Sequence, residues 1–106
     1  MEKTKSLRVS ILLSVQRALA GEIIPAFRLI SVEYSEAEIK IWVYHDGKIN
    51  ANEIEEFDSS VITEVIADFP YPDDSDPKVD FEFVRLDYPE KIKPKGWPVY
   101  GRRERV

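Results

Sequence analysis

Residues 50–77 read NANEIEEFDSSVITEVIADFPYPDDSDP and separate a first from a second group of expected strands. Apolar side chains recur in this segment at spacings of three, four, four and four, which is the period of an amphipathic helix. They are Ile54, Phe57, Val61, Val65 and Phe69. Asn50 is placed to cap the helix, Glu53 occupies the reciprocal capping-box position, and Pro70 ends it. The serine pair at 59–60 forms helix weakly, so a kink or an irregular turn is expected in the middle.

The same segment contains nine acidic side chains and no lysine or arginine. The acidic residues are Glu53, Glu55, Glu56, Asp58, Glu64, Asp68, Asp73, Asp74 and Asp76. An exposed helix usually mixes both signs, because acid–base pairs four residues apart stabilise it slightly. An unrelieved acidic face loses some stability through self-repulsion and attracts a basic partner over long distances. A solvated helix face is the simpler explanation, but the complete absence of cations favours a surface that binds something basic.

A helix and two strands are expected before this segment. Residues 6–20 place apolar side chains on one helical stripe, which predicts an amphipathic helix. Residues 26–34 and 38–44 show the side-chain alternation of strands. The connection between them is too short for anything but a tight turn, so an antiparallel hairpin is expected. In the first of these strands, Phe27 is expected on the face opposite Ile30.

Two further strands are expected after the acidic segment, in residues 78–87 and 97–102. The first alternates strictly, and Pro98 restricts the second to a sheet edge or a strand start. The element order is therefore helix, strand, strand, helix, strand, strand. Strands with one apolar face need a covering layer, which amphipathic helices supply. We expect a two-layer α+β fold, with a mostly antiparallel sheet of about four strands and two helices on one face.

The composition is that of one ordinary domain, expected to span residues 1–106. Hydrophobic residues make up 43% and charged residues 33% of the 106 positions, values that argue against a disordered chain. No cysteine is present, so disulfides and thiolate metal sites are excluded. No apolar run approaches the roughly 18 residues of a membrane span, and no secretory signal is recognisable. We therefore expect a cytoplasmic protein without a membrane partner.

The net charge argues against nucleic acid as the general partner. It is −5, whereas phosphate binding needs a positive potential. Residues 90–106 are nevertheless basic, with six basic and two acidic side chains and with Trp97 and Tyr100 among them. That pattern is typical of contacts to single-stranded nucleic acid. The basic tail can equally pair with the acidic face of the same protein.

Signatures of catalysis and of metal binding are weak. His45 and Asp46 could form a general base with its orienting carboxylate, but adjacent residues of an extended segment point to opposite faces. Asp46 is already explained by the Asp-Gly turn that it forms with Gly47. The loop that contains the acidic residues within 73–76 lacks the glycine and the distal glutamate that a calcium-binding loop needs. We expect no metal, no cofactor and no enzymatic activity; a carboxylate enzyme, which needs a deep pocket of Asp and Glu, is an alternative.

Four segments of the chain together match one family pattern. They are SVQRALAGEIIP (residues 14–25), YHDGKI (44–49), TEVIADFP (63–70) and RLDYPEKI (85–92). In these segments the chain resembles the small bacterial immunity proteins of contact-dependent growth inhibition systems, in particular the group that neutralises ribonuclease-A-like toxin domains. The resemblance implies a cytoplasmic protein of the toxin-producing cell that binds the C-terminal nuclease domain of a delivered toxin and occludes its active site. It implies no catalysis and carries over no binding residues.

The resemblance and the charge pattern together predict an inhibitor of a basic nuclease toxin. We expect a monomer that forms a heterodimeric toxin–immunity complex. The charge argument alone selects the toxin-binding residues, which are Glu53, Glu55, Glu56, Asp58, Tyr71, Asp73, Asp74 and Asp76. Trp42 and Tyr88 are further candidates for aromatic anchors, since aromatic side chains dominate interface energetics. The alternative is a small intracellular interaction or oligomerising domain without a toxin partner.

Overall fold

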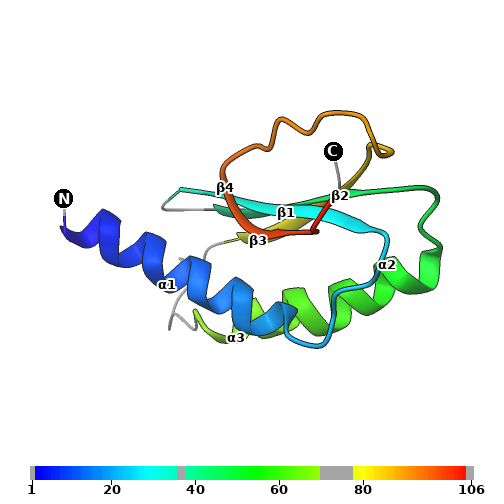
Figure 1. Cartoon of the computed structure of the whole chain (residues 1–106). Helices are drawn as coiled ribbons and strands as arrows, with labels where there is room; N and C mark the ends of the chain where they lie inside the picture. The colour runs from blue at the N-terminus through cyan, green and yellow to red at the C-terminus, as the bar shows by residue number, and fades with distance from the viewer. Residues whose placement is uncertain (1, 36–37, 70–77, 105–106) are drawn as a thin grey trace.

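Four strands form one sheet, and two helical stretches cover a single face of it (Figure 1). The computed structural model describes residues 2–35, 38–69 and 78–104. In chain order the elements are α1 (Glu2–Leu19), β1 (Phe27–Tyr34), β2 (Glu38–His45), α2 (Ala51–Phe57), the π-helical turn η1 (Asp58–Ile62), α3 (Thr63–Ala67), β3 (Lys78–Arg85) and β4 (Trp97–Gly101). The predicted element order and two-layer α+β class are confirmed. Among the described residues, no helix has the length and apolar character that a membrane crossing needs.

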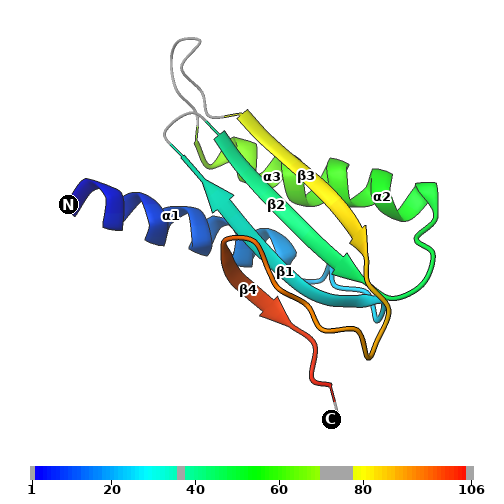
Figure 2. The same ribbon diagram turned by 90° about the horizontal axis from the view of Figure 1, so that it is seen from above.

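The strands are ordered β3-β2-β1-β4 across the sheet (Figure 2). β1 pairs antiparallel with both β2 and β4, which confirms the predicted hairpin and the mostly antiparallel sheet. β3 pairs with β2 in parallel, with Ile41 opposite Phe81. A parallel neighbour needs a crossover connection, and α2, η1 and α3 lie between these two strands in the chain. β3 and β4 are thus the edge strands, as Pro98 predicts for β4.

The predicted second helix forms, and its interruption falls at the predicted place. Asn50 caps it, since its side-chain Oδ1 accepts a hydrogen bond from the backbone N–H of Glu53 at 2.9 Å. Residues 58–62 form a π-helical turn around the serine pair. The hydroxyl of Ser59 donates to the carbonyl oxygen of Glu56 at 3.3 Å, a local bond of the kind that competes with regular helical pairing. The apolar side of the helix stays buried on both sides of this turn.

Four aromatic rings join the helices to the sheet: Phe27, Phe57, Phe81 and Phe83. Contacting pairs among them have centroids 5.3–6.0 Å apart, mostly in edge-to-face arrangements. The expected orientation of Phe27 is wrong, because its ring lies in the core together with Ile30. The strand pairing shifts register between Phe27 and Leu29, and such an irregularity changes the face that a side chain takes. It also buries Arg28, which is 4% exposed.

The loop between β3 and β4 crosses the face of the sheet that the helices leave open (Figure 1). The backbone N–H of Lys95 donates to the hydroxyl of Tyr44 at 3.1 Å. Gly96 has a φ of +78°, and a Cβ atom there would lie 2.2 Å from the carbonyl oxygen of Val32. Only glycine therefore lets the loop approach the sheet this closely.

Gly96→Ala is expected to lower the free energy of unfolding by about 2–4 kcal/mol, since it adds a steric clash to a left-handed backbone. Gly47→Ala is the matched control: its φ is +65°, but a Cβ atom there would meet nothing within 4 Å. It should lose only the conformational cost of about 1–2 kcal/mol. Urea unfolding followed by circular dichroism measures both. Equal losses of unfolding free energy in the two variants would show that the loop moves away from the sheet without a further loss of stability.

Candidate functional site

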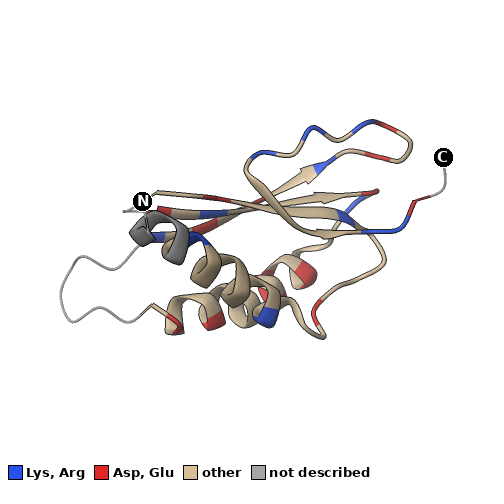
Figure 3. Cartoon of the chain, turned by 60° about the vertical axis from the view of Figure 1, so that its left-hand side comes forward, with Lys and Arg blue, Asp and Glu red and all other residues tan. Residues whose placement is uncertain are grey.

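Five acidic side chains along α2, η1 and α3 form what we call the acidic helix surface: Glu53, Glu55, Glu56, Asp58 and Glu64. Glu53 is half-buried and the other four are exposed. Figure 3 shows acidic positions along this helical stretch without a basic one among them. None of the five forms a salt bridge with any residue that the structure describes.

Asp68, at the end of α3, behaves differently from the other acids of this helix. Its carboxylate accepts a hydrogen bond from the Ser14 hydroxyl at 2.6 Å and lies 3.3 Å from the guanidinium of Arg17. The Ser14 bond and then Arg17 hold the pKa of Asp68 below its ordinary value. Asp68 thus fastens α3 to α1.

The structure describes half of the predicted binding residues. Glu53, Glu55, Glu56 and Asp58 fall within two helical turns, and Glu53 and Glu56 of these four line the cleft between α1 and α2. Tyr71, Asp73, Asp74 and Asp76 lie outside the described residues. The acidic segment therefore separates into a cleft side and an outward side within α2.

The cleft, of about 370 Å³, opens between the end of α1 and the start of α2. Residues 21–27 supply one wall and residues 50–57 the other. Gly21 ends α1 with a φ of +81°, and Glu22 follows it on the first wall. Sequence reasoning missed Glu22, because it lies outside the acidic segment and only the folded chain brings the two walls together. Three carboxylates thus line the cleft: Glu22, Glu53 and Glu56.

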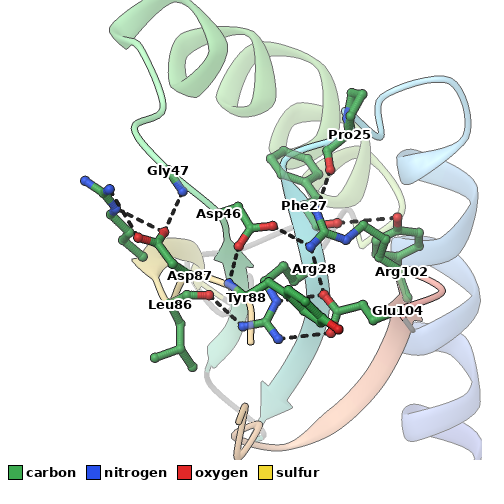
Figure 4. A network of polar contacts seen from close by, with 12 residues as sticks. Pro25, Phe27, Arg28, Asp46, Gly47, Leu86, Asp87, Tyr88, Arg102 and Glu104 are labelled. Carbon is green, nitrogen blue, oxygen red and sulfur yellow. Dashed lines mark hydrogen bonds and ion pairs between the residues drawn. The ribbon is translucent and has the colours of Figure 1, made fainter. Parts of the chain in front are cut away.

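A second group of charged side chains surrounds Arg28 on β1 (Figure 4). The side chain of Arg28 is 3% exposed. Its Nε and Nη2 donate to the two carboxylate oxygens of Glu104 at 2.7 and 2.9 Å, and its Nη1 donates to the carbonyl oxygen of Leu86 at 2.6 Å. Such a two-pronged pair is strong and directional. It fixes the segment after β4 to the sheet.

Arg102 connects this pair to the turn after β2 (Figure 4). Its Nη2 donates to Asp46 and, at 2.9 Å, to Glu104. Asp46 also accepts the backbone N–H of Tyr88. The pKa of the Asp46 carboxyl is lowered, first by the Tyr88 N–H, and the pKa of the Glu104 carboxyl is lowered, first by the bond from Arg28. Sequence reasoning assigned Asp46 to a turn and missed this network, since its members are far apart in the chain.

The free energy of unfolding is expected to fall below about pH 4. A carboxyl with a lowered pKa stabilises the fold above its unfolded pKa, about 3.9 for Asp and 4.3 for Glu, and loses this effect as the pH falls through the folded pKa. Asp46, Asp68 and Glu104 are such groups. Urea unfolding at pH 7, 4 and 3 measures the decline. Asp46→Asn should show a smaller decline of the unfolding free energy between pH 7 and pH 3. A decline equal to that of the wild type would contradict the role given to Asp46.

His45 and Asp46 do not form a catalytic pair. His45 is buried, and its Nδ1 has no hydrogen-bond partner in the described part of the chain. Asp46 is bound by Arg102 instead, and the φ of +65° at Gly47 confirms the predicted turn. In the described ranges, no three His, Asp or Glu side chains are grouped so that they could hold a metal ion.

The basic residues near the C-terminus do not pair with the acidic helix surface in the part of the chain that the structure describes. Lys95 and Lys40 instead place their ammonium groups 4.5 and 4.7 Å from the ring centre of Trp42. The indole N–H of Trp42 donates to Glu33 at 2.6 Å. Trp42 is half-buried and already takes part in these three contacts, whereas Tyr88 is 45% exposed. Tyr88 is the more accessible of these two expected anchors.

An uncompensated acidic surface on a small two-layer fold is suited to a protein that binds a partner of opposite charge. The sequence model of the MafI2 immunity protein family matches residues 8–104, and the chain belongs to that family. It is thus an immunity protein, a class that generally acts by binding a toxin and not by catalysis. A search among curated proteins finds no match. The family confirms the resemblance to small immunity proteins and argues against an interaction domain without a toxin partner.

Proposed function

We propose that this immunity protein neutralises a basic nuclease toxin, namely a ribonuclease delivered in contact-dependent growth inhibition, by covering its active site. The acidic helix surface supports the proposal, because its five carboxylates have no cationic partner among the described residues. A nuclease must hold phosphate groups, so its active site carries lysine and arginine. Carboxylates that compete for the same cations would exclude the nucleic acid.

Speed is a second reason for an acidic surface in such an inhibitor. The immunity protein has to capture the toxin before RNA is cut, and electrostatic steering raises association rates by about 10- to 1,000-fold. Rim charges act mainly on association, whereas buried contacts determine how long the complex lasts. The complex contains one copy of each protein, forms in the cytoplasm where the RNA substrate lies, and needs no catalysis by the immunity protein.

The test uses the toxin domain that we expect the neighbouring gene to encode. We expect the purified domain to cleave total RNA and one molar equivalent of the immunity protein to stop the cleavage. A single-stranded DNA oligonucleotide, which binds such a site without being cleaved, should compete with the immunity protein for the toxin. A toxin without nuclease activity, or a ternary complex of toxin, oligonucleotide and immunity protein, would contradict the proposal.

A further inference from the structure

The cleft between α1 and α2 combines an apolar floor with acidic walls. The half-buried side chain of Ile24 supplies apolar surface to this floor, to which Phe27 and Phe57, at 2% and 3% exposed, add little. Glu22 stands on the wall that follows α1, and Glu53 and Glu56 stand on the wall formed by α2. The volume of about 370 Å³ lies in the range of small ligand sites.

The three carboxylates of this cleft have no cationic partner among the residues that the structure describes. None of them forms a salt bridge with a described residue, although Arg17 and Arg28 both belong to elements that border the cleft. They are also not grouped in the way that a metal ion requires, among the residues described. The occupant that fits is therefore long and apolar along its stem and carries a delocalised positive charge at its end.

We propose that this cleft receives an arginine side chain of the toxin. The methylene stem would pack on the apolar floor beside Ile24, as long cationic side chains do on apolar surface. The planar guanidinium can bond to carboxylates from two walls at once, which the point charge of a lysine ammonium cannot do as well. The inference rests on the proposed toxin binding and adds to it the place where one toxin residue is held.

A held arginine and a general acidic field have different kinetic consequences. Exposed charges change the association rate and its salt dependence, whereas a desolvated charge pair changes the dissociation rate. Arginine is also among the side chains most often found at the few positions that carry most of the binding energy. The cleft acids should therefore differ from the outward acids of the same helix in their effect on dissociation.

Two double variants with the same change in net charge separate these effects. Glu53→Gln/Glu56→Gln removes two cleft carboxylates, and Glu55→Gln/Asp58→Asn removes two outward ones. Surface plasmon resonance on the toxin domain of the neighbouring gene gives both rate constants. We expect the cleft variant to dissociate about 30-fold faster or more, and the outward variant to dissociate at the wild-type rate with slower association. Unchanged urea unfolding confirms that both variants fold, since neither breaks an ion pair.

Substituting each toxin arginine by alanine in turn identifies the partner. One of these toxin variants should bind the wild-type immunity protein more weakly than the unchanged toxin does. The same substitution should cause no further loss of affinity for the cleft variant, and this coupling marks direct contact. Equal dissociation rates in the two double variants, or coupling to no arginine, would overturn the cleft assignment while leaving toxin neutralisation in place. Failure of the wild-type chain to bind the toxin would overturn the proposed function and the cleft assignment with it.

Discussion

Arg28→Met is expected to lower the free energy of unfolding by about 3 kcal/mol. The side chain is 3% exposed, and its guanidinium binds both carboxylate oxygens of Glu104. Its loss removes two charge-assisted hydrogen bonds and leaves the carbonyl of Leu86 without this donor. Glu104 keeps its bond from Arg102 and is 22% exposed, which places the expected loss at the lower end for buried pairs.

Urea denaturation followed by circular dichroism measures this loss. Arg85→Met is the matched control, because Arg85 pairs with Asp87 at the surface, where such pairs contribute about 0–1 kcal/mol. The double variant Arg28→Met/Glu104→Leu should regain much of the stability, since no carboxylate is then left without its partner. Equal losses for Arg28→Met and Arg85→Met would mean that the buried pair does not hold the segment after β4.

Reversing Glu53, Glu56 and Asp58 to lysine is expected to slow association with the toxin by about 100-fold at low salt. The three substitutions change the net charge of −5 by +6, to +1, and place repulsive charges where the attractive ones stood. The difference from wild type should shrink as salt rises, because the Debye length falls to about 8 Å at 0.15 M ionic strength. Stopped-flow association with the toxin domain, repeated over a range of salt concentrations, measures both effects.

A second triple reversal tests whether position or total charge matters. Glu38, Asp80 and Glu90 are exposed and lie outside the acidic helix surface, and their reversal to lysine gives the same net charge of +1. This control should slow association only slightly, since its charges lie away from the proposed contact. An equal effect of both triple variants would show that the toxin responds to overall charge, and no effect of the first would remove the acidic helix surface from the interface.

The local features of the fold follow from the sequence because short-range chemistry determines them. The cap at Asn50, the interruption at Ser59 and the end of α1 at Gly21 each depend on a few neighbouring residues. The alternation of each strand likewise reports which segments are extended. The parallel pairing of β3 was not predicted, because it depends on the path that the whole helical connection takes over the sheet.

Long-range features of the site escape sequence reasoning for a different reason. The register shift beside Phe27 cannot be seen in the alternation of β1, yet it turns that ring into the core and buries Arg28. Arg28 then needs a carboxylate, which comes from Glu104 at the other end of the chain. Glu22 joins the acidic helix only because α1 ends beside α2. Charge composition alone indicated an acidic surface, but not which of its carboxylates line a cleft.

The two edge strands also bear on how a partner can approach the sheet. In β4, Pro98 has no N–H to donate, and in β3 the side chain of Asp80 accepts the N–H of Phe81 at 2.8 Å. Each edge strand thus has one residue whose N–H is missing or already bonded, which weakens pairing with an added strand. Strand addition, by which many small sheets take up peptides or join with copies of themselves, is therefore disfavoured here.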